Sequence, residues 1–397
     1  MDPITNPYAP GAGTMPPELA GRDAIRDRVR ICLARFATGK SDKSILMVGL
    51  RGVGKTVLLD QMRRDAEAQG IHTIRIEAPE DRSLPAMLAP QLRIALLRLS
   101  RMERAREGAR KGLRALAGFV GALKASYGDI EVGIDAESLP GLADNGDLES
   151  DLSDLLQSAG EAAKSAGTAL VLFIDEMQYI NEKEFGALIA ALHRCNHNNL
   201  PLTVVGAGLP QLLARAGNAK SYAERLFDFP MIGALDKNAA SDAITKPAAA
   251  EGVIIEKNAV RRIVEHTRGY AYFLQEWGKH SWDAADESPI TLEDVESATG
   301  TAVAALDESF FRVRLDRLTP AEKRYMRAMA ALGPGPHRSG DIADVLGQKV
   351  TSLGPTRNNL IAKGMVWSPS HGDTAFTVPL FDEFMRRIMP SDTERGT

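Results

Sequence analysis

The first 235 residues alternate between short apolar runs and longer amphipathic stretches. Five runs have the length of buried strands: residues 44–49, 73–77, 169–174, 202–205 and 229–232. The stretches between them, including residues 22–38 and 56–68, repeat their apolar positions with a helical period. Since alternating short strands and helices form parallel sheets covered by helices on both faces, this pattern predicts an α/β fold.

The rest of the chain has a different pattern. Residues 236–307 are helical without further convincing strands. Residues 319–389 begin with a helix at 321–331, pass through Gly-Pro-Gly-Pro, and end with two short strands and a helix. The first 20 residues contain five prolines, which is typical of an extended arm. We therefore predict an arm at 1–20, an α/β domain at 21–235, a helical subdomain at 236–310 and a C-terminal domain at 311–397.

An insertion interrupts the strand and helix alternation at residues 100–151. Its first part, 101–124, has the apolar spacing of an amphipathic helix, and the opposite face is basic. That face consists of Arg101, Arg104, Arg106, Arg110, Lys111 and Arg114. It is either a solvated helix surface or a contact surface for a polyanion or a protein. Residues 130–135 alternate apolar and polar positions, which predicts a hairpin strand, and we expect an acidic loop from Asp144 to Asp151.

Composition narrows the class of protein. The 48 Lys and Arg against 52 Asp and Glu give a net charge of -4, so any surface for nucleic acid must be local. Cys32 and Cys195 are far apart, which suggests neither a disulfide framework nor a zinc site and fits a reducing cytoplasm. The N-terminus lacks the order of a signal peptide and the apolar runs are strand-sized, so we expect a cytoplasmic protein that does not cross a membrane.

A complete GxxxxGK[ST] pattern lies between the first predicted strand and the following helix. It comprises Gly49, Leu50, Arg51, Gly52, Val53, Gly54, Lys55 and Thr56, and Val57 follows it in the helix. Glycines let backbone N–H groups face phosphates, and a helix N-terminus adds partial positive charge. Lys55 can then reach the β- and γ-phosphates, and the Thr56 hydroxyl can bind Mg²⁺.

An acidic pair ends the most apolar predicted strand. Residues 170–174 are Leu-Val-Leu-Phe-Ile, and Asp175 and Glu176 follow them. An aspartate at such a strand end can hold the Mg²⁺ shell, and the adjacent glutamate can polarise water for attack on a γ-phosphate. Together with the glycine-rich loop, this pair predicts a site for ATP and Mg²⁺.

At these residues the sequence resembles a known family. Lys55, Thr56, Asp175 and Glu176 resemble the Walker A and Walker B residues of AAA+ ATPases, in the branch that joins origin-recognition initiator-like proteins to STAND signalling ATPases. The resemblance extends from about Asn6 to about Pro390. It implies a five-stranded parallel sheet of the P-loop NTPase type, followed by a helical lid.

Other positions of the family transfer to this chain with alternatives. Tyr8 and Arg22 resemble the segment that lies over the adenine, or Arg22 is an ordinary helix entry. Arg225 follows the fourth strand, where the family often has an arginine finger acting in a homo-oligomer; the alternative is a structural ion pair. Arg268 could be a sensor 2 residue or a surface charge. The fourth strand departs from the family because it ends Val-Gly-Ala-Gly, without a polar sensor residue.

The C-terminal domain resembles a winged helix-turn-helix. Residues 338–347 have the form of its first helix followed by glycine, and Pro355 and Gly364 are expected to frame the second helix. Residues 366–367 and 375–378 would form the wing, and its aromatic residues, including Phe376, are expected in the core. In this arrangement the second helix would present Arg357, Asn358 and Lys363 to double-stranded DNA.

Charge supports a DNA contact, whereas the family offers an alternative. Residues 312–366 contain ten Lys and Arg against four Asp and Glu, a local excess that phosphates attract. In STAND-type ATPases, however, winged helices often act as protein-contact or autoinhibitory latch modules. We therefore expect an ATP-driven switch, and a slow ATPase, whose C-terminal domain binds either DNA or a protein. A small-molecule kinase is a weaker third hypothesis, because no phosphoacceptor pocket is recognisable.

Overall fold

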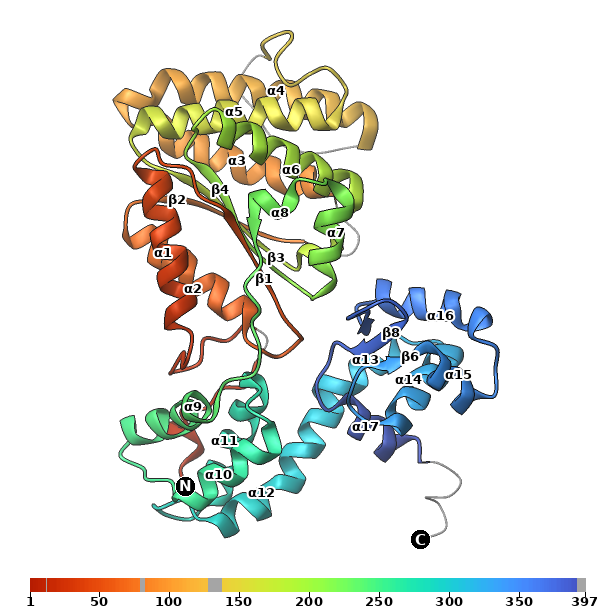
Figure 1. Ribbon diagram of the computed structural model, residues 1–397. Helices are drawn as coiled ribbons and strands as arrows, with labels where there is room; N and C mark the ends of the chain where they lie inside the picture. The colour runs from red at the N-terminus through yellow and green to blue at the C-terminus, as the bar shows by residue number, and fades with distance from the viewer. Residues whose placement is uncertain (12, 79–82, 128–137, 391–397) are drawn as a thin grey trace. The chain divides into compact units, whose positions relative to one another are not determined.

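The structure is a computed structural model that describes residues 1–11, 13–78, 83–127 and 138–390 (Figure 1). Its contacts divide the chain into two compact units. The sheet unit comprises Arg22–Val48 and Lys55–Met231, and the helical unit comprises Met1–Gly21, Gly49–Gly54 and Ile232–Thr397. Each unit has a hydrophobic core that lies largely within it. The predicted boundary at 310 and 311 lies inside the helical unit and stays a prediction.

The sheet unit is built on five parallel strands. They are β1 (Ser44–Val48), β2 (His72–Glu77), β3 (Leu170–Asp175), β4 (Leu202–Gly208) and β5 (Phe227–Asp228). Their order is β2-β3-β4-β1-β5, and every pair is parallel. All residues of β1, β3 and β4 are buried, which explains their continuous apolar runs. The predicted α/β fold with a five-stranded parallel sheet is confirmed.

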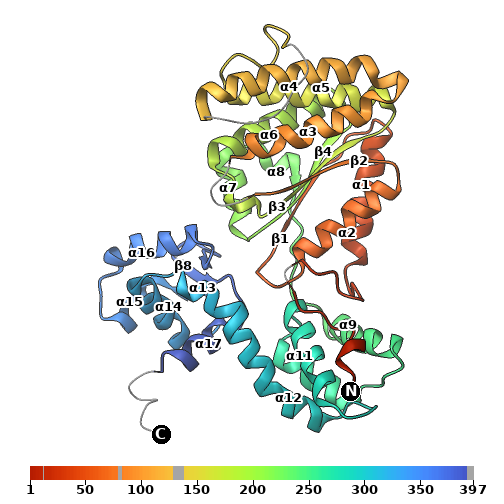
Figure 2. The same cartoon turned by 180° about the vertical axis from the view of Figure 1, so that it is seen from behind.

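Helices cover both faces of this sheet (Figure 2). The helices of this unit are α1 (Asp23–Ala37), α2 (Lys55–Ala68), α3 (Leu84–Ser100), α4 (Arg106–Tyr127), α5 (Leu148–Ala166), α6 (Glu182–His197), α7 (Gln211–Ala219) and α8 (Ala223–Leu226). Both views show α1 and α2 on one face and α3, α5 and α6 on the other. The helices predicted at 22–38 and 56–68 correspond to α1 and α2.

The position of β5 corrects the strand predicted at 229–232. β5 pairs with β1 through Ser44 opposite Phe227 and Ile45 opposite Asp228. Only an isolated bridge, between Val48 and Met231, continues the pairing beyond it. Pro230 interrupts the strand because it has no N–H to donate, although its carbonyl accepts a hydrogen bond from the Val48 amide at 3.0 Å.

The insertion forms part of the sheet unit's core. α4 packs against α3 and α5, and the basic row from Arg101 to Arg114 is exposed. Lys111 of this row pairs with Glu161 of α5 at 2.8 Å. The predicted acidic loop is shorter than expected, because α5 begins at Leu148. Asp151 is buried in α5 and accepts hydrogen bonds from the amides of Asn145 and Gly146. The predicted hairpin strand at 130–135 lies outside the described residues.

The helical unit begins with the N-terminal arm and the predicted helical region. The arm has one short 3-10 turn, η1 (Pro3–Thr5). The region contains α9 (Lys237–Ala250), α10 (Lys257–Thr267), α11 (Ala271–Ala284), α12 (Leu292–Ala305) and the π-helical turn η4 (Leu306–Phe311). The helical character predicted for 236–307 is confirmed.

The C-terminal part of this unit combines helices with a small antiparallel sheet. Its elements are α13 (Arg312–Asp316), α14 (Pro320–Leu332), β6 (His337–Arg338), α15 (Ser339–Leu346), α16 (Val350–Ala362), β7 (Val366–Trp367), β8 (Asp373–Phe376) and α17 (Phe381–Ile388). The sheet order is β6-β8-β7. Phe376 is buried, as predicted, and Phe311 stacks on Phe384 with ring centroids 5.1 Å apart.

The second helix of the predicted helix-turn-helix is α16, and it begins earlier than predicted. Pro355, expected at its start, is the sixth residue of α16. The carbonyl of Thr351 therefore has no N–H four residues later, because proline lacks one. Gly364 follows the helix with φ +64°, as the glycine pattern indicates.

No helix among the residues that the structure describes has both the length and the apolar character needed to span a membrane.

Candidate nucleotide-binding site

The glycine-rich loop joins the end of β1 to the start of α2. Gly52 and Gly54 have φ angles of +79° and +88°, a backbone region that favours glycine. α2 begins at Lys55, and its own first turn contains no acidic residue that would offset the positive end of the helix dipole. Backbone N–H groups that precede such a helix end are a general arrangement for binding phosphate.

Asp175 lies at the carboxyl end of β3 and is 2% exposed. Burial raises the pKa of its carboxyl group, whereas interactions with the Thr56 hydroxyl and the Lys55 ammonium lower it. Oδ1 accepts a hydrogen bond from the Glu176 amide at 2.8 Å. Oδ2 has no hydrogen-bond donor among the described residues. A buried carboxylate oxygen beside a hydroxyl is a suitable pair of ligands for Mg²⁺, so these residues fit that ion.

Glu176 occupies a strained turn directly after the strand. Its backbone is left-handed, with φ 52° and ψ 35°, and it caps the short turn η3 (Met177–Tyr179). A left-handed conformation costs a residue with a side chain about 1 kcal/mol or more, and such strain often marks functional positions. The carboxylate accepts a hydrogen bond from the Gln178 side chain. The turn thus fixes both the backbone and the carboxylate of Glu176.

Gln178 is the residue that sequence reasoning missed. It is 3% exposed, and its Oε1 accepts a hydrogen bond from the Leu209 amide, directly after β4, at 3.0 Å. The absence of a polar residue at the end of β4 was noted from the sequence. The sequence shows a glutamine two positions after Glu176. Its contact with the end of β4 could not be read from the sequence, because it requires β3 and β4 to be neighbours in the sheet.

The two residues proposed near the adenine are held by the rest of the protein. Tyr8 is 3% exposed, and its hydroxyl donates to the carbonyl of Ile244 in α9. A Cβ atom at Gly278 of α11 would lie only 2.6 Å from the Tyr8 ring, so this ring is covered by the helical unit's core. A base could stack on it only if the arm moved. Arg22 caps α1, and burial lowers the pKa of its guanidinium.

The two other candidate arginines differ in their surroundings. Arg225 is exposed in α8 and makes no ion pair with any described residue. The alternative of a structural ion pair therefore finds no support there. Arg268 follows α10 with a left-handed backbone, and its guanidinium pairs with the Glu383 carboxylate of α17 at 2.5 Å. Arg268 is therefore an ion-paired residue in this structure.

Two of the three residues proposed to contact DNA bind within their own domain. The Arg357 guanidinium donates to Thr374 Oγ1 at 2.7 Å and to the Asp373 carbonyl at 2.8 Å. The Lys363 ammonium pairs with the buried Glu322 carboxylate at 2.8 Å. Asn358 is exposed on α16. These contacts give Arg357 and Lys363 a structural role in joining α16 to its neighbours.

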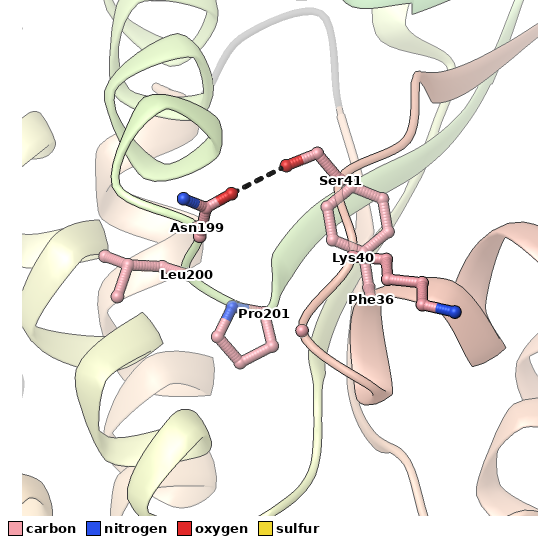
Figure 3. Close-up of a pocket in the computed structure, with 7 residues that line it drawn as sticks. Phe36, Lys40, Ser41, Asn199, Leu200 and Pro201 are labelled. Atoms are coloured by element: carbon pink, nitrogen blue, oxygen red, sulfur yellow. Dashed lines mark hydrogen bonds between the residues drawn. The ribbon is translucent and has the colours of Figure 1, made fainter.

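A shallow pocket lies at the opposite end of the sheet from the acidic pair (Figure 3). Its lining comes from the end of α1, with Phe36, and from the loops before β1 and β4, with Lys40, Asn199 and Pro201. Ser41 Oγ donates to Asn199 Oδ1 at 3.2 Å across it. Since Asp175 and Glu176 follow the carboxyl end of β3, this pocket is separate from the candidate nucleotide site.

Comparisons with known proteins agree with this geometry. Residues 18–205 match the model of a family described as the AAA ATPase domain, and residues 308–385 match one described as a domain of unknown function. A search of the curated proteins found no match. The Walker-type ATPase of Pyrococcus abyssi is similar in structure, with 14% identity, a TM-score of 0.59, and coverage of 94% of this chain and 97% of that chain.

Two further solved structures are similar at lower scores. The RuvB Holliday junction branch migration motor of Thermotoga maritima has 16% identity and a TM-score of 0.43, covering 90% of this chain and 92% of that chain. The Orc1 protein of Aeropyrum pernix, in complex with DNA, has 16% identity and a TM-score of 0.46, covering 96% and 94%. The family model and the Pyrococcus structure support an AAA ATPase domain with a P-loop fold.

Proposed function

We propose that the loop from Gly49 to Thr56, together with Asp175 and Glu176, binds ATP with Mg²⁺ and hydrolyses it. The observation that carries this proposal is the buried Asp175 carboxylate at the end of β3, whose Oδ2 has no donor among the described residues. A solvated loop would not need a carboxylate buried in this way. The match of residues 18–205 to the AAA ATPase domain supports the same proposal.

Each side chain has a role that follows from its chemistry. Lys55 binds the β- and γ-phosphates from the start of α2, while Thr56 and Asp175 hold the metal. Bound Mg²⁺ supplies positive charge that offsets the charge of the phosphates. Glu176 orients and polarises the attacking water, because its carboxylate lies beside the metal ligand Asp175 in sequence and is held by the η3 turn.

We propose Arg225 as the residue that stabilises charge on the γ-phosphate of a neighbouring subunit in a homo-oligomer. Its exposure on α8 and the lack of an ion pair among the described residues support this role. Arg22 and the N-terminal arm remain our candidates for the adenine contact. Of these, Tyr8 would contribute only after leaving the core of the helical unit.

We further propose that residues 236–310 form a lid and that residues 311–397 form a winged helix. α14, α15 and α16 precede the β7 and β8 hairpin, which is the order of elements in that motif. A left-handed Gly347 after α15 also agrees with it. The Tyr272 amide of α11 donates to the Gly52 carbonyl at 3.0 Å within the helical unit. Through this bond, nucleotide at the glycine-rich loop would act on the proposed lid.

The output of the winged helix has two candidate forms. The local excess of basic residues supports DNA binding. Hydrogen bonds and ion pairs within the chain support an intramolecular latch instead. Arg357 and Lys363 are bound within the domain, and the Arg51 amide of the glycine-rich loop donates to the Thr377 carbonyl at 2.9 Å. We therefore favour a nucleotide-controlled latch that regulates a protein contact.

Nucleotide binding tests the first proposal. Wild type should bind a fluorescent ATP analogue and hydrolyse ATP, and Lys55→Ala should lose both. Lys183→Ala on α6 is the matched control. Binding that is equal in wild type and Lys55→Ala would contradict the proposal.

Duplex DNA distinguishes the two outputs. For the latch, we expect a hydrolysis rate that is independent of DNA and weak retention that the Asn358→Asp substitution leaves unchanged. Salt-sensitive DNA binding that Asn358→Asp reduces, together with DNA-stimulated hydrolysis, would instead establish the DNA-coupled switch.

A further inference from the structure

The side chain of Gln178 joins two ends of the sheet that the nucleotide site uses. Its Nε2 donates to the Glu176 carboxylate, after β3, and its Oε1 accepts from the Leu209 amide, after β4. The orientation of the amide follows from these partners, since a main-chain N–H requires an acceptor and a carboxylate requires a donor. Gln178 is buried, so water does not replace either partner readily.

Two glycines of β4, Gly206 and Gly208, leave space for the η3 turn. A Cβ atom at Gly208 would lie 3.0 Å from Gln178 Oε1, and one at Gly206 would lie 2.2 Å from Met177 Sδ. Larger residues at these two positions would displace the η3 turn that follows Glu176. The two glycines thus allow Gln178 to occupy the place where β4 itself has no polar side chain.

Arg215 of α7 holds the backbone of the η3 turn through hydrogen bonds. Its guanidinium donates to the carbonyls of Gln178 and Ile180, and burial lowers its pKa, an effect that the Glu182 charge opposes. Bonds from one planar guanidinium to two carbonyls hold the backbone of the turn in one position. The side chain of Gln178 therefore projects from a fixed base.

We infer that Gln178 is a positioning residue for Glu176, holding its carboxylate in register with the end of β4 during ATP hydrolysis. This inference rests on the proposed hydrolytic function. The donor of the Gln178 amide limits rotation of the Glu176 side chain, and the carboxylate can then direct a water molecule. Gln178 belongs to the turn after β3, apart from the glycine-rich loop, so its loss should slow hydrolysis without weakening the binding of ATP.

Two substitutions separate this role from packing. Gln178→Met keeps the length of the side chain but removes the donor, and kcat should fall about 10- to 100-fold, the usual effect of losing an orienting partner. KM for ATP should remain near that of wild type, whereas the melting temperature should fall, because methionine also removes the acceptor of the buried Leu209 amide. Gln157→Ala is the control, because it removes a side-chain amide that bonds to Asn198 at 2.7 Å elsewhere in the sheet unit.

Gln178→Glu supplies a readout that a structural role would not produce. Glutamate keeps the size of the side chain and the acceptor for the Leu209 amide, but it places a carboxylate where Glu176 requires a donor. kcat should therefore fall at least as far as in Gln178→Met, while KM for ATP stays near that of wild type.

The outcomes distinguish the inference from the function on which it rests. A kcat that is the same in wild type and Gln178→Met, or the same in wild type and Gln178→Glu, would overturn the role of Gln178 alone. If wild type binds ATP but does not hydrolyse it, both the hydrolytic function and this inference fail.

Discussion

The main-chain amide of Arg51 donates a hydrogen bond to the carbonyl of Thr377, with 2.9 Å between nitrogen and oxygen. Arg51 lies in the glycine-rich loop, and Thr377 is a fully buried residue between β8 and α17. Phosphate-binding loops use their amides to hold phosphates, so a nucleotide that reorders this loop would compete with the Thr377 carbonyl. Under the proposed function, this bond would couple nucleotide binding to the C-terminal part of the chain.

Reversing the charge of Glu383 should strengthen ATP binding. Glu383 pairs with Arg268 at 2.5 Å and anchors α17, which begins four residues after Thr377. The Glu383→Arg substitution replaces this attraction with repulsion and should weaken the Thr377 bond to the loop. Because exposed ion pairs are weak, we expect a gain in ATP affinity of about 2- to 5-fold, measured by titration of a fluorescent analogue.

Two further variants control this experiment. Combining Glu383→Arg with Arg268→Glu restores the opposite charges and should return the affinity to that of wild type. Glu296→Arg disrupts a comparable exposed pair, between Arg262 and Glu296 at 2.6 Å, and should have no effect. An affinity that is the same in Glu383→Arg and wild type would argue against the latch.

The Asp175→Asn substitution should stabilise the nucleotide-free protein at alkaline pH. Burial raises the pKa of Asp175 above that of the unfolded chain. A raised pKa favours folding below the unfolded pKa, and this advantage is lost as the pH rises through the folded pKa. Asparagine avoids the buried charge, so its melting temperature should exceed that of wild type by about 2–4 °C at pH 8 and by less at low pH.

With Mg²⁺ and ATP present, the melting temperature of wild type should exceed that of Asp175→Asn, the reverse of the order in the nucleotide-free proteins. ATP with Mg²⁺ should raise the melting temperature of wild type, whereas Asp175→Asn should gain little, because a neutral amide binds Mg²⁺ poorly. Asp154→Asn, which alters an exposed pair with Arg194, is the control. A nucleotide-free Asp175→Asn protein less stable than wild type at pH 8 would contradict the burial argument.

Arg225 should act between subunits. The Arg225→Ala and Glu176→Gln variants should each be slow alone, but a mixture should hydrolyse ATP faster than the sum of the two. The reason is that a mixed oligomer contains sites with an intact Glu176 and a neighbour's intact Arg225. Activity per subunit in wild type should also rise with protein concentration. A flat dependence, together with an additive mixture, would remove the role in trans.

Local sequence signals predicted the strands and the helix that flank the candidate site. The apolar run before Gly49 is β1, and Lys55 begins α2, so the loop occurs in the context that its pattern requires. The acidic pair follows β3 in the same way. These features depend on neighbours in the chain, where strand and helix signals are strongest. The P-loop fold could therefore be predicted from the sequence.

Features that depend on tertiary contacts could not be predicted in this way. Pro355 is accommodated inside α16, although local rules place proline at a helix start. Tyr8 is covered by α9 and α11, more than 200 residues away in the chain. Gln178 contacts the backbone after β4 only because β3 and β4 are neighbours in the sheet.

The most direct test of the account is steady-state hydrolysis by wild type and Glu176→Gln, with ATP affinity measured on the same preparations. We expect Mg²⁺-dependent hydrolysis by wild type and a decrease of about 100-fold or more in Glu176→Gln, with ATP affinity unchanged. Glutamine keeps the shape of the side chain and removes the carboxylate that polarises water. Equal hydrolysis by the two proteins, or no ATP binding by wild type, would contradict the account.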